Sequence, residues 1–318
     1  MSKPRALYYR VLNYDVENLA LLRRHFDVTE LDDPRQDTDA ALAAVELLFA
    51  PLGFAVDEGR LARCPKLRVV ASNTTGIPHF DVDALSRRGV AICALHDEQE
   101  FLQTITPTAE HTIGLMIAAL RRIPAAHAAA AAGEWSRWPW GAPRMLSRMR
   151  LGVVGMGRIG TWVGRIGEAM DMDVGFYDPH VVGGYPSLLD LARRSDVLSL
   201  HVPATAETAG LVSAGVIRAL PRGAVIVNTA RGELLDTDAL LAALEDGHLH
   251  AAALDTIAGE YEPGFSERFG ASPVAVYARS HDNLILTPHI GGSTLDAWRE
   301  TQRRVIVKAM TVFGMAAA

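Results

Sequence analysis

Four polar side chains in the C-terminal half of the chain are of the types that exchange protons with a substrate. Each follows a short apolar run typical of a buried strand, and the four are Arg231, Asp255, Glu260 and His289. A histidine beside a carboxylate forms a general acid/base pair, because the acid raises the proton affinity of the imidazole. An arginine can bind a carboxylate through two hydrogen bonds and polarise a neighbouring carbonyl. Each residue alone could be a surface ion pair, a solvated acid or a turn residue, but their shared position favours catalysis.

A glycine-rich turn upstream predicts a dinucleotide site. Gly155, Gly157 and Gly160 follow the apolar run 151–154, at the point where a helix should begin. The first glycine permits a tight turn, the second lets the backbone approach a pyrophosphate, and the third allows close packing of helix on strand. The helix then offers free N–H groups and the positive end of its dipole to the phosphates.

Asp178 directly follows the next predicted strand, 173–177, and lies 18 residues after Gly160. At this spacing an acid can accept hydrogen bonds from the ribose hydroxyls of a dinucleotide. Its charge would repel a 2′-phosphate, so we expect NAD rather than NADP. A methyltransferase or a merely structural βαβ unit could also carry such a turn. The full order of strand, turn, helix, strand and acid favours a dinucleotide, and a methyltransferase would not use Arg231 or His289.

Composition limits the other functional classes. The 318 residues predict two domains, and a formal charge of −6 argues against nonspecific nucleic-acid binding. The only two cysteines, Cys64 and Cys93, are expected to be reduced core residues. The N-terminus lacks the apolar stretch of a signal peptide and no apolar run reaches membrane-spanning length, so we expect a cytoplasmic protein without a membrane partner.

Apolar segments alternate along the chain in the order typical of parallel α/β sheets. The first strand is expected over 6–12, an apolar linking helix over 106–122 and a long final helix over 294–313. A polar loop follows the buried run 67–72, and it is either a substrate contact or an ordinary turn. This loop consists of Asn73, Thr74, Thr75 and Gly76.

The chain resembles the D-isomer-specific 2-hydroxyacid dehydrogenases, the family that includes phosphoglycerate, glycerate and D-lactate dehydrogenases. The resemblance covers most of residues 67–292. The matching stretches are VVGMGRIG, FYDP, LHVPAT, VNTARGELLD, AALDTIAGE and LTPHIGG, with SNTTGIPHFDVDAL and TAEHTIGL upstream.

This resemblance implies an α/β fold of two Rossmann-like, doubly wound parallel-sheet domains with a cleft between them. Residues 1–104 plus 293–318 would form a discontinuous, flavodoxin-like substrate-binding (catalytic) domain, and residues 105–292 an NAD-binding Rossmann domain. It further implies a small 2-hydroxy or 2-oxo acid as substrate, NAD as cofactor and a homodimer as the assembly.

The resemblance also implies roles for individual residues. Arg231 would bind the substrate carboxylate and carbonyl, His289 would exchange the proton, and Glu260 would support His289. The substrate set is Asn73, Thr74, Thr75, Gly76 and Arg231. The cofactor set is Gly155, Gly157, Arg158, Ile159, Gly160, Asp178, His201, Val202, Pro203, Thr229, Ala230, Asp255 and Gly291.

The chain departs from the family pattern after the glutamate. The family commonly has proline directly after it, whereas Glu260 is followed by Tyr261 and Glu262, so Glu262 is a rival partner for His289. The polar stretch 258–282 is expected to be a long loop able to fold over the site. Residues 96–101 are also not the family's usual glycine-containing approach to the linking helix. Both departures leave the substrate open.

Other functions remain as alternatives. A noncatalytic, NAD-sensing binding protein uses the same fold, and a phosphite or formate dehydrogenase is a further alternative, although formate dehydrogenases pair their histidine with glutamine. A metal site at His248 and His250 lacks further ligands, so no metal is expected. Three tryptophans in six residues, Trp135, Trp138 and Trp140, are either a subunit contact or local packing.

Overall fold

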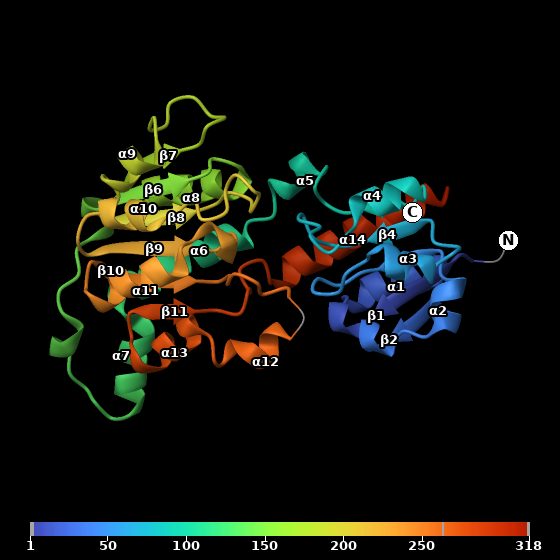
Figure 1. The fold of residues 1–318 in the computed structure, drawn as a ribbon, viewed down its shortest axis with the longest axis horizontal. Coiled ribbons are helices and arrows are strands. Elements are labelled where there is room, and N and C mark those ends of the chain that lie inside the picture. The colour runs from blue at the N-terminus through green and yellow to red at the C-terminus, as the bar shows by residue number, and fades with distance from the viewer. Residues whose placement is uncertain (1–2, 263, 317–318) are drawn as a thin grey trace. The chain divides into compact units, whose positions relative to one another are not determined.

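A computed structural model describes residues 3–262 and 264–316, which form two compact units. The first unit comprises the chain up to Ile105 together with the chain from Thr294 onward, and the second unit runs from Thr106 to Ser293. Each unit holds one sheet, and all strand pairs in both sheets are parallel (Figure 1). The predicted α/β class with two parallel-sheet domains is confirmed.

The first unit has a five-stranded sheet in the order β2-β1-β3-β4-β5. Side chains alternate along β1, so that Ala6 and Tyr8 lie in one apolar cluster while Leu7 and Tyr9 lie in another. Both faces of the sheet are therefore covered. The strands are β1 (Arg5–Tyr9), β2 (Asp27–Leu31), β3 (Leu47–Phe49), β4 (Val69–Ala71) and β5 (Ala91–Cys93). The helices are α1 (Val16–His25), α2 (Asp39–Ala44), α3 (Glu58–Ala62), α4 (Val82–Arg87), α5 (Gln99–Leu102) and α14 (Leu295–Val312).

The last helix returns to the first unit. α14 packs against α1, β4 and β5, and its Val305 and Ile306 are fully buried. The first strand is shorter than predicted. It ends at Tyr9, because residues 10–12 form the 3-10 turn η1 (Arg10–Leu12), which closes on Asn13 in the left-handed region at φ 47°.

The second unit has a six-stranded sheet in the order β11-β10-β9-β8-β6-β7. The chain leaves β6 for β7 on one side and returns to β8 on the other, which creates a switch point where open α/β sheets bind ligands. The strands are β6 (Arg150–Val154), β7 (Asp173–Tyr177), β8 (Val197–Leu200), β9 (Ala224–Asn228), β10 (Leu249–Leu254) and β11 (Leu284–Leu286). The helices are α6 (Pro107–Arg121), α7 (Ile123–Ala131), α8 (Arg158–Ala169), α9 (Leu188–Ala192), α10 (Ala214–Ala219), α11 (Thr237–Glu245), α12 (Phe265–Phe269) and α13 (Pro273–Ser280).

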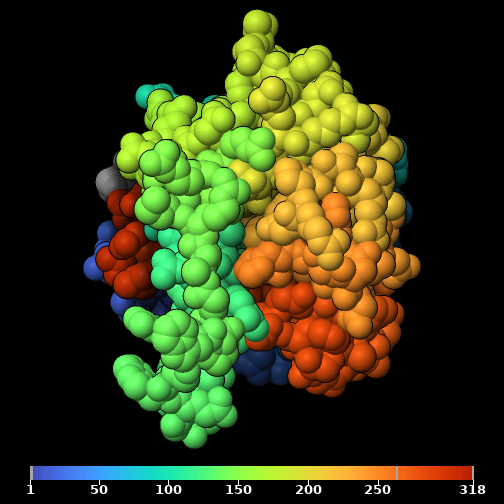
Figure 2. Space-filling model, turned by 90° about the vertical axis from the view of Figure 1, so that its left-hand side faces the viewer, coloured from blue at the N-terminus to red at the C-terminus, as the bar shows by residue number. Residues whose placement is uncertain are grey.

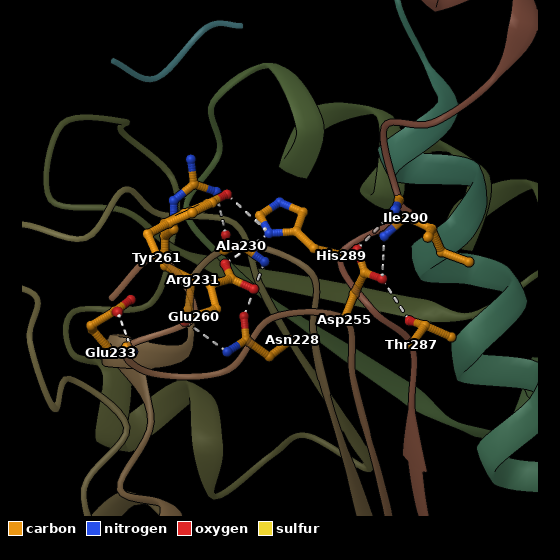
Figure 3. Close-up of polar contacts among 12 residues, drawn as sticks. Asn228, Ala230, Arg231, Glu233, Asp255, Glu260, Tyr261, Thr287, His289 and Ile290 are labelled. Atoms are coloured by element: carbon orange, nitrogen blue, oxygen red, sulfur yellow. Dashed lines mark hydrogen bonds and ion pairs between the residues drawn. The ribbon is translucent and has the colours of Figure 1, made fainter. Parts of the chain in front are cut away.

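The polar stretch 258–282 is not the long loop expected from the sequence. It contains α12 and α13, and α13 packs against α11 and β11 through the buried side chains of Val274 and Ala275. Within this stretch, Glu260 and Tyr261 lie next to His289, as Figure 3 shows.

The alanine-rich segment forms α7, which has no buried residue, and the tryptophans follow it. Trp135 is 94% and Trp138 78% exposed, so local packing is the wrong interpretation for these two rings. Figure 2 shows this segment, in green, standing out from the surface of the second unit. The subunit contact stays a prediction. Trp140 is partly buried, and the Arg122 guanidinium lies 5.4 Å from the centre of its ring.

Two other expectations concern cysteines and membrane spans. Cys64 and Cys93 are free and buried, as predicted, and burial raises the pKa of the Cys93 thiol to about 11. No helix in the described part of the chain is long and apolar enough to cross a membrane.

Two loops of the second unit touch at Gly232. This residue begins η5 (Gly232–Leu234) after β9, and the backbone that follows β10 lies directly against it. A Cβ at Gly232 would lie 2.0 Å from the Ala258 nitrogen, so only glycine fits. Beside it, Glu233 Oε1 accepts a hydrogen bond from the Gly259 N–H at 3.1 Å. The loops after β9 and β10 are therefore held together.

Replacing Gly232 with alanine should lower the free energy of unfolding by about 3 kcal/mol, because the added methyl forces the two backbones apart. Urea denaturation followed by circular dichroism measures the change. Gly114→Ala in α6 is the matched control, since a Cβ there meets nothing within 4 Å. An unfolding midpoint for Gly232→Ala equal to that of the control would contradict the close contact of the two loops.

Candidate active site

Three neighbouring strand ends of the second unit carry the side chains predicted to do chemistry. β9, β10 and β11 are adjacent and parallel, so their carboxyl ends share one edge of the sheet. Arg231, Asp255 and His289 follow these strands in turn. Figure 3 shows the three residues and their polar neighbours gathered there.

Asp255 is only 1% exposed, and its carboxylate organises the turn that follows β11. Oδ1 accepts from Thr287 Oγ1 at 2.6 Å and from the Ile290 N–H at 2.9 Å, and Oδ2 accepts from the Gly291 N–H at 2.8 Å. A buried carboxylate needs such donors in place of water. The same three hydrogen bonds fix the backbone on both sides of His289.

The backbone of His289 lies in the left-handed region, at φ 53°. Its N–H donates to the main-chain oxygens of Asp255 and Thr287, each at 2.9 Å. A residue with a Cβ pays about 1 kcal/mol for this conformation, which persists only where neighbouring bonds impose it. The turn thereby decides the direction in which the imidazole leaves the backbone.

The imidazole of His289 pairs with Glu260, as the resemblance implies. Nδ1 lies 2.7 Å from Glu260 Oε1, and the Glu260 side chain is only 12% exposed. The rival acid, Glu262, forms an ion pair with Arg268 at 3.1 Å instead. Of the two acids, Glu260 is therefore the partner of His289 in this structure.

Tyr261 is a second neighbour of the same nitrogen, which the sequence analysis did not identify. Its hydroxyl oxygen lies 3.1 Å from His289 Nδ1 (Figure 3). Burial first, and then the charge of Glu260, raise the pKa of Tyr261 to about 12, with Arg231 acting in the opposite direction. The phenol is therefore neutral near pH 7. No sequence motif could have placed this side chain, because its position depends on the fold of the turn.

His111 of α6 was also missed. Its Nε2 lies 3.1 Å from Thr287 Oγ1 and 3.3 Å from Asp255 Oδ1, so α6 supports the same turn. The only available signal was its place in the stretch TAEHTIGL that carries the family resemblance.

Arg231 is held by its own turn. Asn228 Nδ2 donates to the Arg231 main-chain oxygen at 2.8 Å, and Asn228 Oδ1 accepts from the Ala230 N–H at 3.0 Å. Arg231 Nη1 donates to the Ala230 oxygen at 2.6 Å, and its other side-chain nitrogens have no hydrogen bond within the described residues. Those nitrogens can therefore serve a substrate carboxylate. Thr229 is buried, with its hydroxyl 2.7 Å from that of Thr112.

The glycine turn after β6 fits a dinucleotide. Gly155 has φ 92°, and a Cβ there would lie 2.8 Å from the His201 oxygen. A Cβ at Gly160 would lie 1.9 Å from the Gly155 oxygen, so α8 begins directly on the turn. Nothing lies within 4 Å of a Cβ position at Gly157, which leaves the space that a pyrophosphate would need. These residues fit the predicted cofactor.

The acid after β7 already holds the turn. Asp178 Oδ2 accepts from the Met156 N–H and Oδ1 from the His180 N–H, both at 2.8 Å. Across the switch point, His201 Nε2 lies 2.8 Å from Ser199 Oγ. Burial lowers the pKa of His201 to about 3, so this ring is neutral.

The other residues predicted to bind the cofactor lie at the ends of neighbouring elements of the second unit. Arg158 and Ile159 begin α8, and burial lowers the pKa of the Arg158 guanidinium. Val202 and Pro203 follow β8, and a Cβ at Gly291 would lie 2.8 Å from Asp255 Oδ2.

The predicted substrate loop lies in the first unit, at the carboxyl end of β4. Thr74 Oγ1 donates to the Gly76 oxygen at 2.7 Å and lies 2.9 Å from Ser72 Oγ. The Leu95 N–H donates to the Thr74 oxygen at 3.1 Å. These bonds shape the loop, while Asn73 is partly buried and Thr75 is exposed.

Metal binding has no support at His248. Its Nε2 lies 3.0 Å from the Ile217 oxygen, which explains the residue as a structural one. In the described ranges, no three His, Cys, Asp or Glu side chains gather in a way that could hold a metal ion.

Comparison with known proteins agrees with the geometry. The sequence profile of the D-isomer specific 2-hydroxyacid dehydrogenase NAD-binding domain matches residues 113–291. A D-3-phosphoglycerate dehydrogenase of Mycobacterium bovis is 36% identical over 88% of this chain and 51% of its own length. A glyoxylate reductase of Aeropyrum pernix is 32% identical over 97% of this chain and 91% of its own length.

A crystal structure of D-lactate dehydrogenase from Aquifex aeolicus, complexed with NAD and lactic acid, is similar over 97% of this chain and 95% of its own, with a TM-score of 0.82 and 28% identity. The chain spans about half the length of the mycobacterial relatives. The profile match extends over most of the second unit, and the Aeropyrum relative matches nearly the whole chain. The chain belongs to the D-isomer specific 2-hydroxyacid dehydrogenase family, and its second unit contains the family's NAD-binding domain.

Proposed function

We propose that the chain is an NAD-dependent oxidoreductase that interconverts a D-2-hydroxy acid and its 2-oxo acid. The observation that supports this most directly is the 2.7 Å contact between His289 Nδ1 and Glu260 Oε1. A carboxylate beside Nδ1 accepts a hydrogen bond, so we assign the ring hydrogen to Nδ1, which leaves the lone pair on Nε2. A histidine in this form can accept the proton of a substrate hydroxyl.

In the proposed oxidation, His289 Nε2 takes the hydroxyl proton, and in the reduction it returns that proton to the substrate oxygen. Glu260 stabilises the imidazolium formed on the way. Arg231 binds the substrate carboxylate and supplies positive charge where the oxygen becomes negative. Bound NAD supplies the acceptor for the hydride from C2.

Besides Arg231, we assign substrate binding to the backbone around Thr75 and Gly76 of the first unit, and we assign cofactor binding to the second unit. The relatives favour a small acid, because one is named a glyoxylate reductase and one structure holds lactic acid. The choice of NAD over NADP depends on the carboxylate of Asp178, which would repel a 2′-phosphate.

A panel of 2-oxo acids tests the reaction class. Glyoxylate, pyruvate, hydroxypyruvate, 3-phosphohydroxypyruvate and 2-oxoisocaproate are each mixed with NADH or NADPH, and absorbance of the reduced nicotinamide is followed. We expect NADH oxidation with at least one acid. If no acid leads to oxidation of NADH or NADPH, while calorimetry shows that NADH binds, the result would favour the noncatalytic NAD-sensing alternative and overturn the proposed activity.

His289→Asn should lower kcat by about 1000-fold, because the general acid/base is lost. Asparagine tolerates the left-handed backbone at this position, so the turn should survive. The Kd for NADH, measured by fluorescence titration, should stay within twofold. His281→Asn, which changes a histidine at the end of α13, is the control. Retained turnover in His289→Asn would disprove the proton-transfer role.

Asp178→Ala should lower the preference for NADH over NADPH by about tenfold, measured as the ratio of kcat/KM values. Asp178→Asn separates charge from structure, because its amide oxygen can still accept from the Met156 N–H. A lower preference for NADH in both variants would identify the charge of Asp178 as the cause of that preference. An unchanged ratio in both would show that Asp178 does not select the cofactor.

A further inference from the structure

His289 Nδ1 has two oxygen neighbours, although a carboxylate alone is enough to form an acid/base pair with a histidine. Glu260 Oε1 lies at 2.7 Å and the Tyr261 hydroxyl at 3.1 Å. The two rings, of Tyr261 and His289, have centroids 5.9 Å apart and planes inclined by 48°. Figure 3 shows the tyrosine hydroxyl pointing at the imidazole from beside Arg231.

The chemistry of the three groups indicates which way the hydrogen bonds run. We assign a single hydrogen to Nδ1, because the carboxylate of Glu260 beside it is a hydrogen-bond acceptor. The Tyr261 oxygen therefore accepts from the same N–H as the weaker partner of a shared bond. Its own hydroxyl hydrogen stays on the phenol.

Tyr261 can hold this position because its turn is fixed. The Glu260 N–H donates to the Ile257 oxygen at 3.2 Å, and the Glu262 N–H donates to the Gly259 oxygen at 2.9 Å. The turn is tied to the loop after β9 at Gly232 and through Glu233. The tyrosine is thereby anchored to the same loop that carries Arg231.

We propose that Tyr261 is a positioning residue for His289. Two oxygens on one side of the imidazole hold its Nδ1 edge toward the protein and so keep Nε2 turned toward the substrate. Tyr261 stands directly after Glu260, where the family resemblance implies a proline, and a proline offers no such group. The inference rests on the proposed function, because it assigns a task to the proposed acid/base residue.

Tyr261→Phe removes only the hydroxyl and tests the proposal. With the best substrate of the panel, kcat should fall by about tenfold, a part of what the whole acid/base provides. KM and the Kd for NADH should change less than twofold, since Tyr261 is proposed to act only through His289. In the reduction, the rate declines at high pH as His289 loses its proton. This decline should move to lower pH in Tyr261→Phe, because the tyrosine oxygen stabilises the protonated imidazole and its removal lowers the pKa of His289.

Tyr277→Phe is the matched control. Tyr277 lies on α13 in the same segment, and its ring is stacked on His281 with centroids 3.9 Å apart. Loss of that hydroxyl should leave kcat, KM and the pH profile unchanged. An equal loss in both variants would assign the effect to the fold of the segment and overturn a specific role for Tyr261.

A second measurement does not depend on turnover. In protein labelled with ¹⁵N-histidine, the Nδ1–H resonance of His289 is identified by its loss in His289→Asn. We expect this resonance to shift, and to exchange faster with water, in Tyr261→Phe but not in Tyr277→Phe. An unshifted resonance together with wild-type kcat would overturn the proposal. If no 2-oxo acid of the panel is reduced, the proposed dehydrogenase activity is rejected, and the resonance still tests Tyr261 separately. An unchanged Nδ1–H resonance in Tyr261→Phe would then also reject the proposed contact of Tyr261 with His289.

Discussion

The buried carboxylate of Asp255 is the interaction on which the arrangement of the polar side chains depends. Removing a charge from water costs several kcal/mol unless donors replace the lost hydration. Here the donors come from one short turn, at Thr287, Ile290 and Gly291. The turn closes around the carboxylate, and the left-handed backbone of His289 is a consequence of that closure. The direction of the imidazole is thus decided by a residue that never needs to touch a substrate.

A second constraint joins the other two strand ends. The absence of a side chain at Gly232 lets the backbone that follows β10 lie against the loop after β9. Glu260 and Arg231 then belong to two loops that are held in contact with each other. Parallel strands alone bring such residues to a common edge, but they do not determine distances of a few ångströms. Those distances come from the carboxylate of Asp255, the contact at Gly232 and the amide of Asn228.

The parts of the fold that follow from local chemistry were predictable from the sequence. The apolar runs 67–72 and 151–154 predicted the buried strands β4 and β6. The predicted neighbours His289 and Glu260 are in contact in the structure, while their acid/base role stays a prediction. Elements that depend on tertiary contacts were not predictable. α12 and α13 are short, and their segment reads as a polar loop until α13 packs on β11. Tyr261 and His111 act through neighbours distant in sequence.

The residue after Glu260, where the family resemblance implies a proline, lies in contact with the histidine. A proline there fixes the backbone but contributes no hydrogen-bonding group. A tyrosine leaves the glutamate in place and adds a neutral oxygen on the same edge of the imidazole. Glu260 keeps its 2.7 Å contact with His289, so Tyr261 adds a third group beside the proposed acid/base pair without replacing either member. The Arg231 side chain lies beside the Tyr261 ring. Tyr261 is therefore a neighbour of both His289 and Arg231, the two residues proposed to contact the substrate.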